Sequence, residues 1–330
     1  MQKLIWIILC CTIGVNAQLS EQMLPLYQSF SSTDYQGDTQ SWDIVQAKDG
    51  LIYVGNQPGI LEFDSRNWRM IPNANGSLVR SLAVDKNGRV YAGCSGDFGY
   101  LAPDSLNKMQ YHSLLEYLPE EEKGFNYVWS TIATDEGVYF ATLDMLYRFT
   151  PTDNVDTPWI IKFWPAESRI MYALYENETL YVVEGDSGLK KLHNDRLEFV
   201  EGSKFLAQDR LQTLLPFKDN PTKMLVGTFG SGLYTYNGRS FKPFPTDVDD
   251  YLKKNVLYKG VVLPDGNFGF CTLSGGFVII SPQGQHIQPL STENILPSNT
   301  ISEAFVDRQN QFWLAADNAI IQIEIASPIK

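Results

Sequence analysis

The chain has 330 residues, of which 44% are apolar, so it can bury a large core within a single domain. Its 38 acidic side chains outnumber the 26 basic ones, which gives a formal net charge of −12. A surface of this sign repels phosphate backbones, so we expect no nucleic-acid partner.

The N-terminal segment has the pattern of a secretory signal peptide. Lys3 supplies the positive charge, 4–11 is an unbroken apolar run, and Val15 and Ala17 are small residues that suit cleavage after Ala17. The apolar run is too short to span a bilayer stably. We therefore expect residues 1–17 to be removed and residues 18–330 to form one domain in the periplasm or outside the cell.

Residues 41–68 contain a structural unit that recurs along the chain. Three short runs typical of β-strands lie at 42–47, 51–54 and 60–63, and a fourth run follows at 68–71. Lys48-Asp49-Gly50 joins the first two runs. An Asp-Gly pair between two such runs favours a hairpin, because Gly adopts positive φ without a steric clash.

Six later segments repeat this unit. One aromatic or small apolar residue in each second strand sets the register, and successive anchors lie 38 to 48 residues apart. The anchors are Tyr53, Tyr91, Tyr139, Tyr181, Leu225, Gly269 and Trp313. A period of about 40–45 residues with four short strands is typical of propeller blades, whereas a sandwich has no such period and a β-helix has shorter repeats. We predict an all-β, seven-bladed β-propeller of four-stranded antiparallel blades.

The two ends of the chain predict how the ring closes. The seventh unit lacks a fourth run, because the chain stops soon after Ile325, while residues 24–30 form a spare strand ahead of the first unit. We expect this spare strand to be the outer strand of blade seven, which removes an open sheet edge. Short helical turns are expected at 114–123 and 247–254.

The mature chain would contain two cysteines, Cys94 and Cys271. The register places them in different blades, three apart around the ring. A disulfide needs Cα atoms within about 7 Å, so we predict two buried free thiols.

The repeats resemble those of the two-component regulator propeller family. The resemblance rests on 79–93 (VRSLAVDKNGRVYAG) and, more loosely, on 225–233 (LVGTFGSGL). The opening, 35–64, is similar to the start of periplasmic sensor regions of Bacteroidetes-type hybrid two-component and three-tyrosine regulators. The resemblance covers nearly all of the mature chain.

In that family the propellers precede a three-tyrosine β-sandwich, a transmembrane helix and a cytoplasmic histidine kinase or DNA-binding module. The resemblance thus implies an extracytoplasmic, ligand-sensing domain without catalytic activity, with glycan breakdown products as the ligand class. It implies a membrane-bound signalling partner or further C-terminal modules, and it leaves a dimer open. Because the given sequence ends at Lys330, we expect either a fragment of a longer receptor or a free-standing sensor-like propeller.

Enzyme motifs are mostly absent from the sequence. It has no His-Glu-x-x-His, no Gly-x-Ser-x-Gly and no phosphate-binding Gly-Lys-Ser/Thr. His112, His193 and His286 fall on outer strands or loops and lack a metal-ligand spacing. We expect no enzyme activity, no metal and no cofactor. Two alternatives remain: a lactonase-like propeller hydrolase or lyase with a metal in the channel, for which Asp43 and Glu303 are candidates, and a protein-binding scaffold.

One set of candidate ligand-binding residues follows from the register. First strands line the central channel of a propeller, so residues at their starts should ring one mouth of it. This channel-mouth ring consists of Trp42, Arg80, Trp129, Met171, Gln212, Tyr258 and Ser302. All except Met171 are candidates, because aromatics, an Arg and polar side chains suit a sugar ring or a carboxylated ligand. In the competing interpretation the two Trp residues pack between blades and Arg80 pairs with a neighbouring acid.

Overall fold

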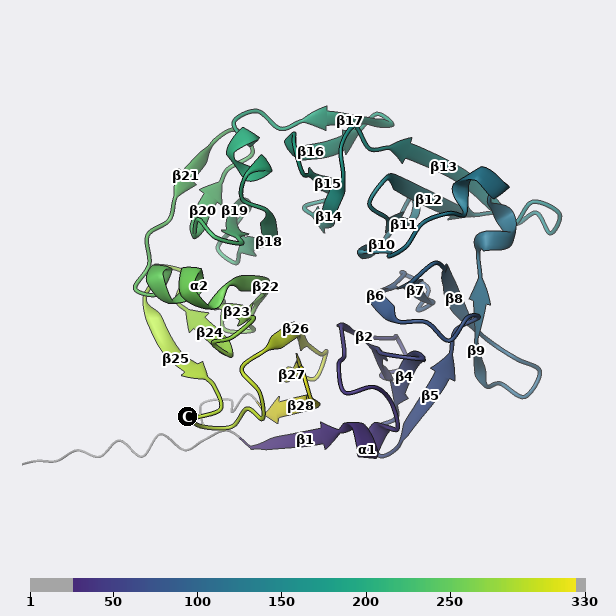
Figure 1. The fold of residues 1–330 in the computed structure, drawn as a ribbon, viewed down its shortest axis with the longest axis horizontal. Coiled ribbons are helices and arrows are strands. Elements are labelled where there is room, and N and C mark those ends of the chain that lie inside the picture. The colour runs from purple at the N-terminus through teal and green to yellow at the C-terminus, as the bar shows by residue number, and fades with distance from the viewer. Residues whose placement is uncertain (1–25, 325–330) are drawn as a thin grey trace, which may run out of the picture.

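A computed structural model describes residues 26–324. Seven four-stranded antiparallel sheets surround a central axis (Figure 1), which confirms the predicted seven-bladed β-propeller. The predicted signal peptide at 1–17 and the first two residues of the predicted closing strand, 24–25, lie outside the described residues.

In each blade the first strand is innermost and the fourth is outermost (Figure 1). The first strands are β2 (Asp43–Gln46), β6 (Val79–Val84), β10 (Ser130–Thr134), β14 (Ile170–Glu176), β18 (Leu211–Phe217), β22 (Leu257–Val262) and β26 (Ile301–Val306). The second strands are β3 (Ile52–Gly55), β7 (Val90–Cys94), β11 (Gly137–Ala141), β15 (Thr179–Glu184), β19 (Asn220–Thr228), β23 (Phe268–Thr272) and β27 (Gln311–Ala316).

The outer half of each blade follows the same order. The third strands are β4 (Gly59–Phe63), β8 (Phe98–Pro103), β12 (Met145–Pro151), β16 (Gly188–His193), β20 (Leu233–Tyr236), β24 (Phe277–Ile280) and β28 (Ala319–Glu324). The fourth strands are β5 (Trp68–Pro72), β9 (Met109–Ser113), β13 (Trp159–Pro165), β17 (Arg196–Phe199), β21 (Phe241–Pro243), β25 (His286–Leu290) and, for blade seven, β1 (Tyr27–Ser31).

Strand β1 closes the ring as predicted. It pairs antiparallel with β28, in a register that runs from Tyr27 opposite Ile323 to Ser31 opposite Ala319. Phe30 of this strand is buried, and its ring centre lies 5.1 Å from that of Phe63 in blade one. The N-terminal strand therefore completes the sheet of blade seven and also packs against blade one.

The apolar core is divided into seven clusters, each of which lies between two neighbouring blades. Six second-strand anchors contribute large buried side chains to this packing. The seventh anchor is Gly269, and close packing explains the absence of a side chain there, because a Cβ would lie 2.1 Å from the Phe277 ring. Blades are thus held to their neighbours by interlocking side chains, which explains why one strand pattern recurs seven times.

Helical segments are few and lie between blades. They are α1 (Ser32–Tyr35), α2 (Asp249–Asn255) and three 3₁₀ turns at Leu115–Tyr117, Glu120–Glu122 and Lys204–Ala207. The predictions for 114–123 and 247–254 are confirmed. No helix within residues 26–324 is long and apolar enough to cross a membrane.

Both cysteines of the described chain are buried free thiols, as predicted. Cys94 lies in β7 of blade two and Cys271 in β23 of blade six. Burial raises the pKa of Cys94 to about 12. Neither thiol is therefore expected to be reactive while the protein is folded.

Candidate ligand-binding site at the channel mouth

Most residues of the channel-mouth ring lie where the pairing between the first and second strands of a blade is irregular. In five blades, the pairing of the first and second strands shifts at one residue, which is the extra residue of a β-bulge. These residues are Arg80, Met171, Gln212, Tyr258 and Ser302. A bulge redirects a side chain away from the regular alternation of the strand, and bulges are frequent beside binding sites.

The two tryptophans of the ring lie at the corresponding position in blades one and three. Trp42 and Trp129 each precede the first strand, and their backbone N–H groups donate to the carbonyls of Gly55 and Ala141. Both side chains are half-buried.

Arg80 is held between these two tryptophans. Its guanidinium carbon lies 4.1 Å from the ring centre of Trp42 and 4.1 Å from that of Trp129. Its Nη2 donates a 3.2 Å hydrogen bond to the hydroxyl of Tyr258 in blade six, so the contact links blades on different sides of the channel. Arg80 forms no ion pair with a carboxylate of residues 26–324. The competing sequence interpretation, in which an acid neutralises Arg80, does not describe this arrangement.

A cavity of about 80 Å³ adjoins the stacked side chains, and we call it the channel-mouth pocket. Its lining consists of Trp129, Met171, Tyr172, Arg210, Leu211, Gln212, Phe229, Tyr258 and Lys259. Three of the six candidate residues, Trp129, Gln212 and Tyr258, therefore lie together. Arg80 and Trp42 adjoin the pocket through the stack on Trp129.

Ser302 is the candidate that the structure does not bring into the pocket. Its side chain is buried, and its hydroxyl oxygen lies 2.6 Å from the carbonyl oxygen of Ser41 in blade one. It also lies 3.0 Å from the carbonyl oxygen of Ala315. The hydroxyl therefore joins two blades.

Sequence reasoning missed Arg210 and Phe229, which flank the pocket on loops before β18 and after β19. The Arg210 guanidinium carbon lies 4.7 Å from the Phe229 ring centre, and the Phe229 backbone N–H donates to the Arg210 carbonyl at 2.9 Å. The side chain of neighbouring Asp209 accepts from the N–H groups of Gly230 and Ser231, at 2.7 and 2.6 Å. Loop residues lie outside the strand register, so the register could not select Arg210 or Phe229. The only local signal in the sequence was the Gly-rich turn at 227–232, which contains Phe229.

A buried charged cluster, formed by Asp43, Lys259 and Glu303, lies one residue further along three first strands. Lys259 forms an ion pair with Glu303, and Asp43 Oδ2 accepts a 2.8 Å hydrogen bond from the backbone N–H of Leu82. Burial raises the pKa of Glu303 to about 7 and also raises that of Asp43. Burial opposes the charge of Lys259, but Glu303 and the other nearby acidic groups outweigh it and raise the Lys259 pKa well above its usual value.

Two residues of this cluster, Asp43 and Glu303, are the candidate metal ligands of the hydrolase or lyase alternative. Both candidate carboxylates are engaged, one with the Lys259 ammonium and the other with a backbone N–H group. Within the described residues, no group of three or more His, Cys, Asp and Glu side chains is arranged to hold a metal. The three histidines lie on β9, β16 and β25, which are third or fourth strands.

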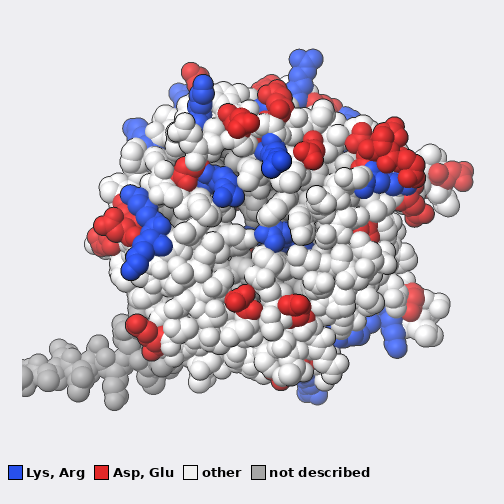
Figure 2. Space-filling view, viewed as in Figure 1, with Lys and Arg blue, Asp and Glu red and all other residues white. Residues whose placement is uncertain are grey.

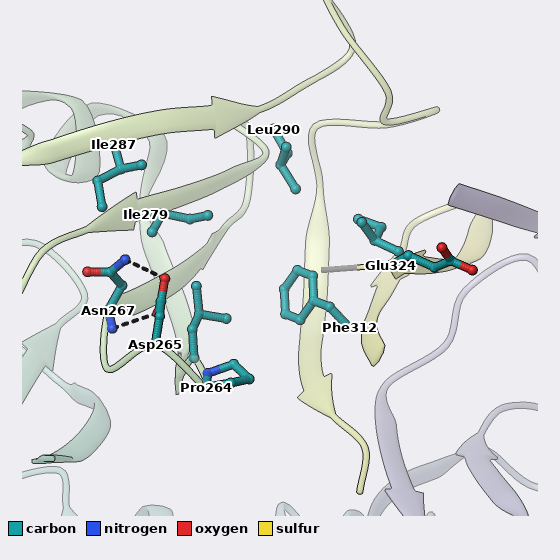
Figure 3. A pocket seen from close by; sticks show the side chains of 10 residues that line it. Pro264, Asp265, Asn267, Ile279, Ile287, Leu290, Phe312 and Glu324 are labelled. Atoms are coloured by element: carbon teal, nitrogen blue, oxygen red, sulfur yellow. Dashed lines mark hydrogen bonds between the residues drawn. The ribbon is translucent and has the colours of Figure 1, made fainter. Parts of the chain in front are cut away.

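Other hollows also lie away from the channel. An apolar pocket of about 220 Å³ between blades six and seven contains Ile279, Leu290 and Phe312 (Figure 3). A groove of about 460 Å³ between blades two and three contains Tyr100 and Trp159. Neither contains a residue of the channel-mouth ring.

Fold and site together define a seven-bladed propeller with an aromatic and cationic pocket at one end of its axis. No protein-family model and no curated protein sequence matches the chain. Solved structures show which propellers it is similar to.

Two similar structures are extracellular domains of hybrid two-component systems from B. thetaiotaomicron. The BT4673 domain superposes with a TM-score of 0.70 at 17% sequence identity, over 93% of this chain and 41% of that domain. For the BT3049 domain the TM-score is 0.69 at 15% identity, over 92% of this chain and 42% of that domain. The chain therefore spans about two fifths of these extracellular domains, and the similarity confirms the propeller fold that the family resemblance implied.

An enzyme has the same fold. A streptogramin B lyase superposes with a TM-score of 0.66 at 13% identity, over 91% of this chain and 97% of the lyase. At such low identity the similarity concerns the fold, and the function depends on the site.

Proposed function

We propose that this protein is an extracytoplasmic ligand-sensing propeller that binds a small molecule, of the carbohydrate class, at the channel-mouth pocket. The observation that carries the proposal is the pocket itself, where Trp129, Gln212 and Tyr258 from three blades meet. Aromatic faces stack on sugar rings, while amide and hydroxyl groups hydrogen-bond to their substituents. The similarity to extracellular domains of two-component systems supports the sensing role.

The position of the pocket suits a sensor. Its lining comes from the first strands of blades four, five and six, from the residue that precedes the first strand of blade three, and from the loop residues Arg210 and Phe229 of blade five. A ligand there would contact several blades at once, so binding would favour one relative arrangement of them. We propose that this change passes to a membrane-bound signalling partner or to signalling modules of the same receptor.

A thermal-shift screen against oligosaccharides from glycan breakdown tests the binding proposal. Ligands that stabilise the purified protein are then titrated against Trp129→Ala and Trp159→Ala variants. Trp159 lies on β13, the outermost strand of the same blade, and serves as a matched control. Loss of one stacking contact, worth on the order of 1–2 kcal/mol, should weaken binding about tenfold in the first variant only. A screen without ligands, or equal binding by both variants, would contradict the proposal.

The lyase-like alternative makes a different prediction. Another similar structure is that of a catalytically inactive histidine-to-alanine variant of virginiamycin B lyase from Staphylococcus aureus. In this chain the histidines lie on outer strands, so a channel mechanism would require other residues. Metal analysis of the purified protein distinguishes the ligand-sensing proposal from the enzyme alternative, because a stoichiometric, tightly bound divalent ion would favour the enzyme.

A further inference from the structure

The stack of Arg80 on Trp42 and Trp129, which adjoins the channel-mouth pocket, has an excess of hydrogen-bond donors. Arg80 carries five N–H donors, and only one of them has a protein acceptor among the described residues, the hydroxyl of Tyr258. The indole N–H groups of Trp42 and Trp129 are buried and have no acceptor there. Tyr258 accepts from Arg80, so its own O–H remains available to donate. Buried donors of this kind are costly unless a ligand or water supplies the missing acceptors.

The charged side chains that line the pocket are positive, which suits the same kind of ligand as the unpaired donors do. None of its nine lining residues is acidic, and two are basic, Arg210 and Lys259, although Glu303 behind the lining neutralises Lys259. Figure 2 shows a positive side chain at the centre of one face of the ring, with both positive and negative side chains around it. Helix α2 directly precedes β22, the first strand of blade six, and lies on the face turned to the viewer in Figure 1, so this face is the one at which the first strands begin.

The cations of the site differ in whether a carboxylate neutralises them. Lys259 is paired with Glu303. Arg80 and Arg210 have no ion pair within residues 26–324, and the carboxylate next to Arg210, that of Asp209, is bonded to backbone N–H groups. Arg80 lies beside the pocket, in contact with the lining residues Trp129 and Tyr258, and Arg210 is exposed at its rim, so neither guanidinium charge is neutralised within these residues.

We propose that the ligand of the channel-mouth pocket presents an oxyanion, a carboxylate or a sulfate, to Arg80 and Arg210; this inference rests on the proposed function. Guanidinium groups bind planar carboxylates and sulfates through paired N–H···O contacts, and these charge-assisted bonds are the stronger kind. The pocket volume of about 80 Å³ fits such a group better than a whole sugar ring. The oxyanion would then enter the pocket while the rest of the ligand extends across the aromatic mouth.

The test compares oligosaccharides that differ in charge. Three probe sets are titrated by calorimetry: uronic-acid oligosaccharides, their carboxyl-reduced neutral counterparts, and sulfated oligosaccharides of the same length. We expect binding by acidic probes and at least tenfold weaker binding by the neutral counterparts. Whether the uronate or the sulfate set binds identifies the oxyanion. Raising the salt concentration from about 50 to 300 mM should weaken the interaction, because the Arg210 contact is exposed.

Variants assign the contact to the two arginines. Arg210→Gln should keep the wild-type melting temperature, since the side chain is exposed, and should lose at least tenfold in affinity for the acidic probe. Arg80→Gln should lose as much or more, and a melting curve verifies its fold. Arg66→Gln, an exposed arginine in the turn before β5, is the charge-matched control and should bind as the wild type does.

The outcomes distinguish this inference from the proposed function. Neutral probes that bind as tightly as acidic ones, with affinity that still depends on Trp129, would overturn the oxyanion and leave the sensor proposal intact. Unchanged affinity in Arg210→Gln and Arg80→Gln would overturn it as well. If no oligosaccharide of any set binds, the inference and the proposed function both fail.

Discussion

Arg80 and the two tryptophans around it form the part of the channel mouth on which the proposed binding site depends. Each face of the guanidinium stacks on an indole ring, yet both indole N–H groups lack acceptors among the described residues. The indole N–H of Trp68, which packs against the cluster between blades seven and one, also lacks an acceptor among the described residues, so the unpaired donors at the channel mouth support the proposed site only together with the stack on Arg80. The arrangement is pre-organised, because the stack fixes the guanidinium plane before any ligand arrives.

Replacing a tryptophan of this stack should destabilise the protein less than replacing a core aromatic. Trp129→Ala removes one cation–π contact and part of a half-buried surface, so we expect a loss of about 1–2 kcal/mol in the free energy of unfolding. Phe98→Ala, in the cluster between blades two and three, should cost about 3–5 kcal/mol. Urea denaturation of both variants is the measurement. Equal, large losses would show that Trp129 is ordinary core packing.

Glu303 should make stability depend on pH in a defined direction. Its pKa is about 7 in the folded protein against an ordinary value of 4.5, chiefly because it is buried. Between these values the folded state holds a proton that the unfolded chain releases, so this group lowers the free energy of unfolding as pH rises from about 4.5 to 7. The stabilising contribution of the protonated Glu303 is therefore fully present below about pH 4.5 and is lost above about pH 7.

The Glu303→Gln variant isolates that contribution. The stability difference between wild type and variant should shift against the wild type as pH rises through the range, measured by urea denaturation at several pH values. Glu293→Gln, on an exposed loop, is the control and should follow the wild type. A variant at position 303 with the same pH profile as the wild type would refute the assignment.

Among the elements, β1 carries the closure of the ring. Phe30→Ala removes a buried ring that contacts Phe63 and Trp68 of blade one, so we expect a loss of about 3–5 kcal/mol. Tyr27→Ala, on the same strand but 49% exposed, is the matched control and should cost little. Calorimetric melting of both variants tests the expectation.

Removing the whole element should have a larger effect. Deletion of residues 18–34 would leave the edge of β28 unpaired, and exposed edges associate. We expect oligomers or aggregates in sedimentation velocity. A truncated protein that remains monomeric with an unchanged melting temperature would contradict this role of β1.

At the scale of elements the sequence was a good guide, because strand alternation and Gly-containing turns are local signals. Seven blades, the closing strand and the short helical turns were all predicted from them. The β-bulges were not predicted, since a bulge depends on how two strands pair and leaves little trace in either one. The sequence register nevertheless selected Arg80, Gln212 and Tyr258, because it counts back from the second strand across the bulge to the same residue in each blade.

Contacts between blades account for what the sequence missed. Ser302 has the expected position along its strand, but its hydroxyl turns to the carbonyl of Ser41 in the next blade. Arg210 reaches the pocket from a loop, and Lys259 lies one residue beyond the predicted ring position. Such details depend on distances between segments far apart in the chain, which a single sequence does not specify.

For the whole molecule, we propose that ligands bind at the end of the axis where the first strands begin. Hydrogen–deuterium exchange with and without the strongest oligosaccharide ligand tests it directly. We predict slower exchange in the segments at the starts of the first strands, 78–83, 127–132, 209–214 and 256–261, with little change elsewhere. Protection confined to the aromatic groove between blades two and three, around Tyr100 and Trp159, or to the outer strands would contradict the account.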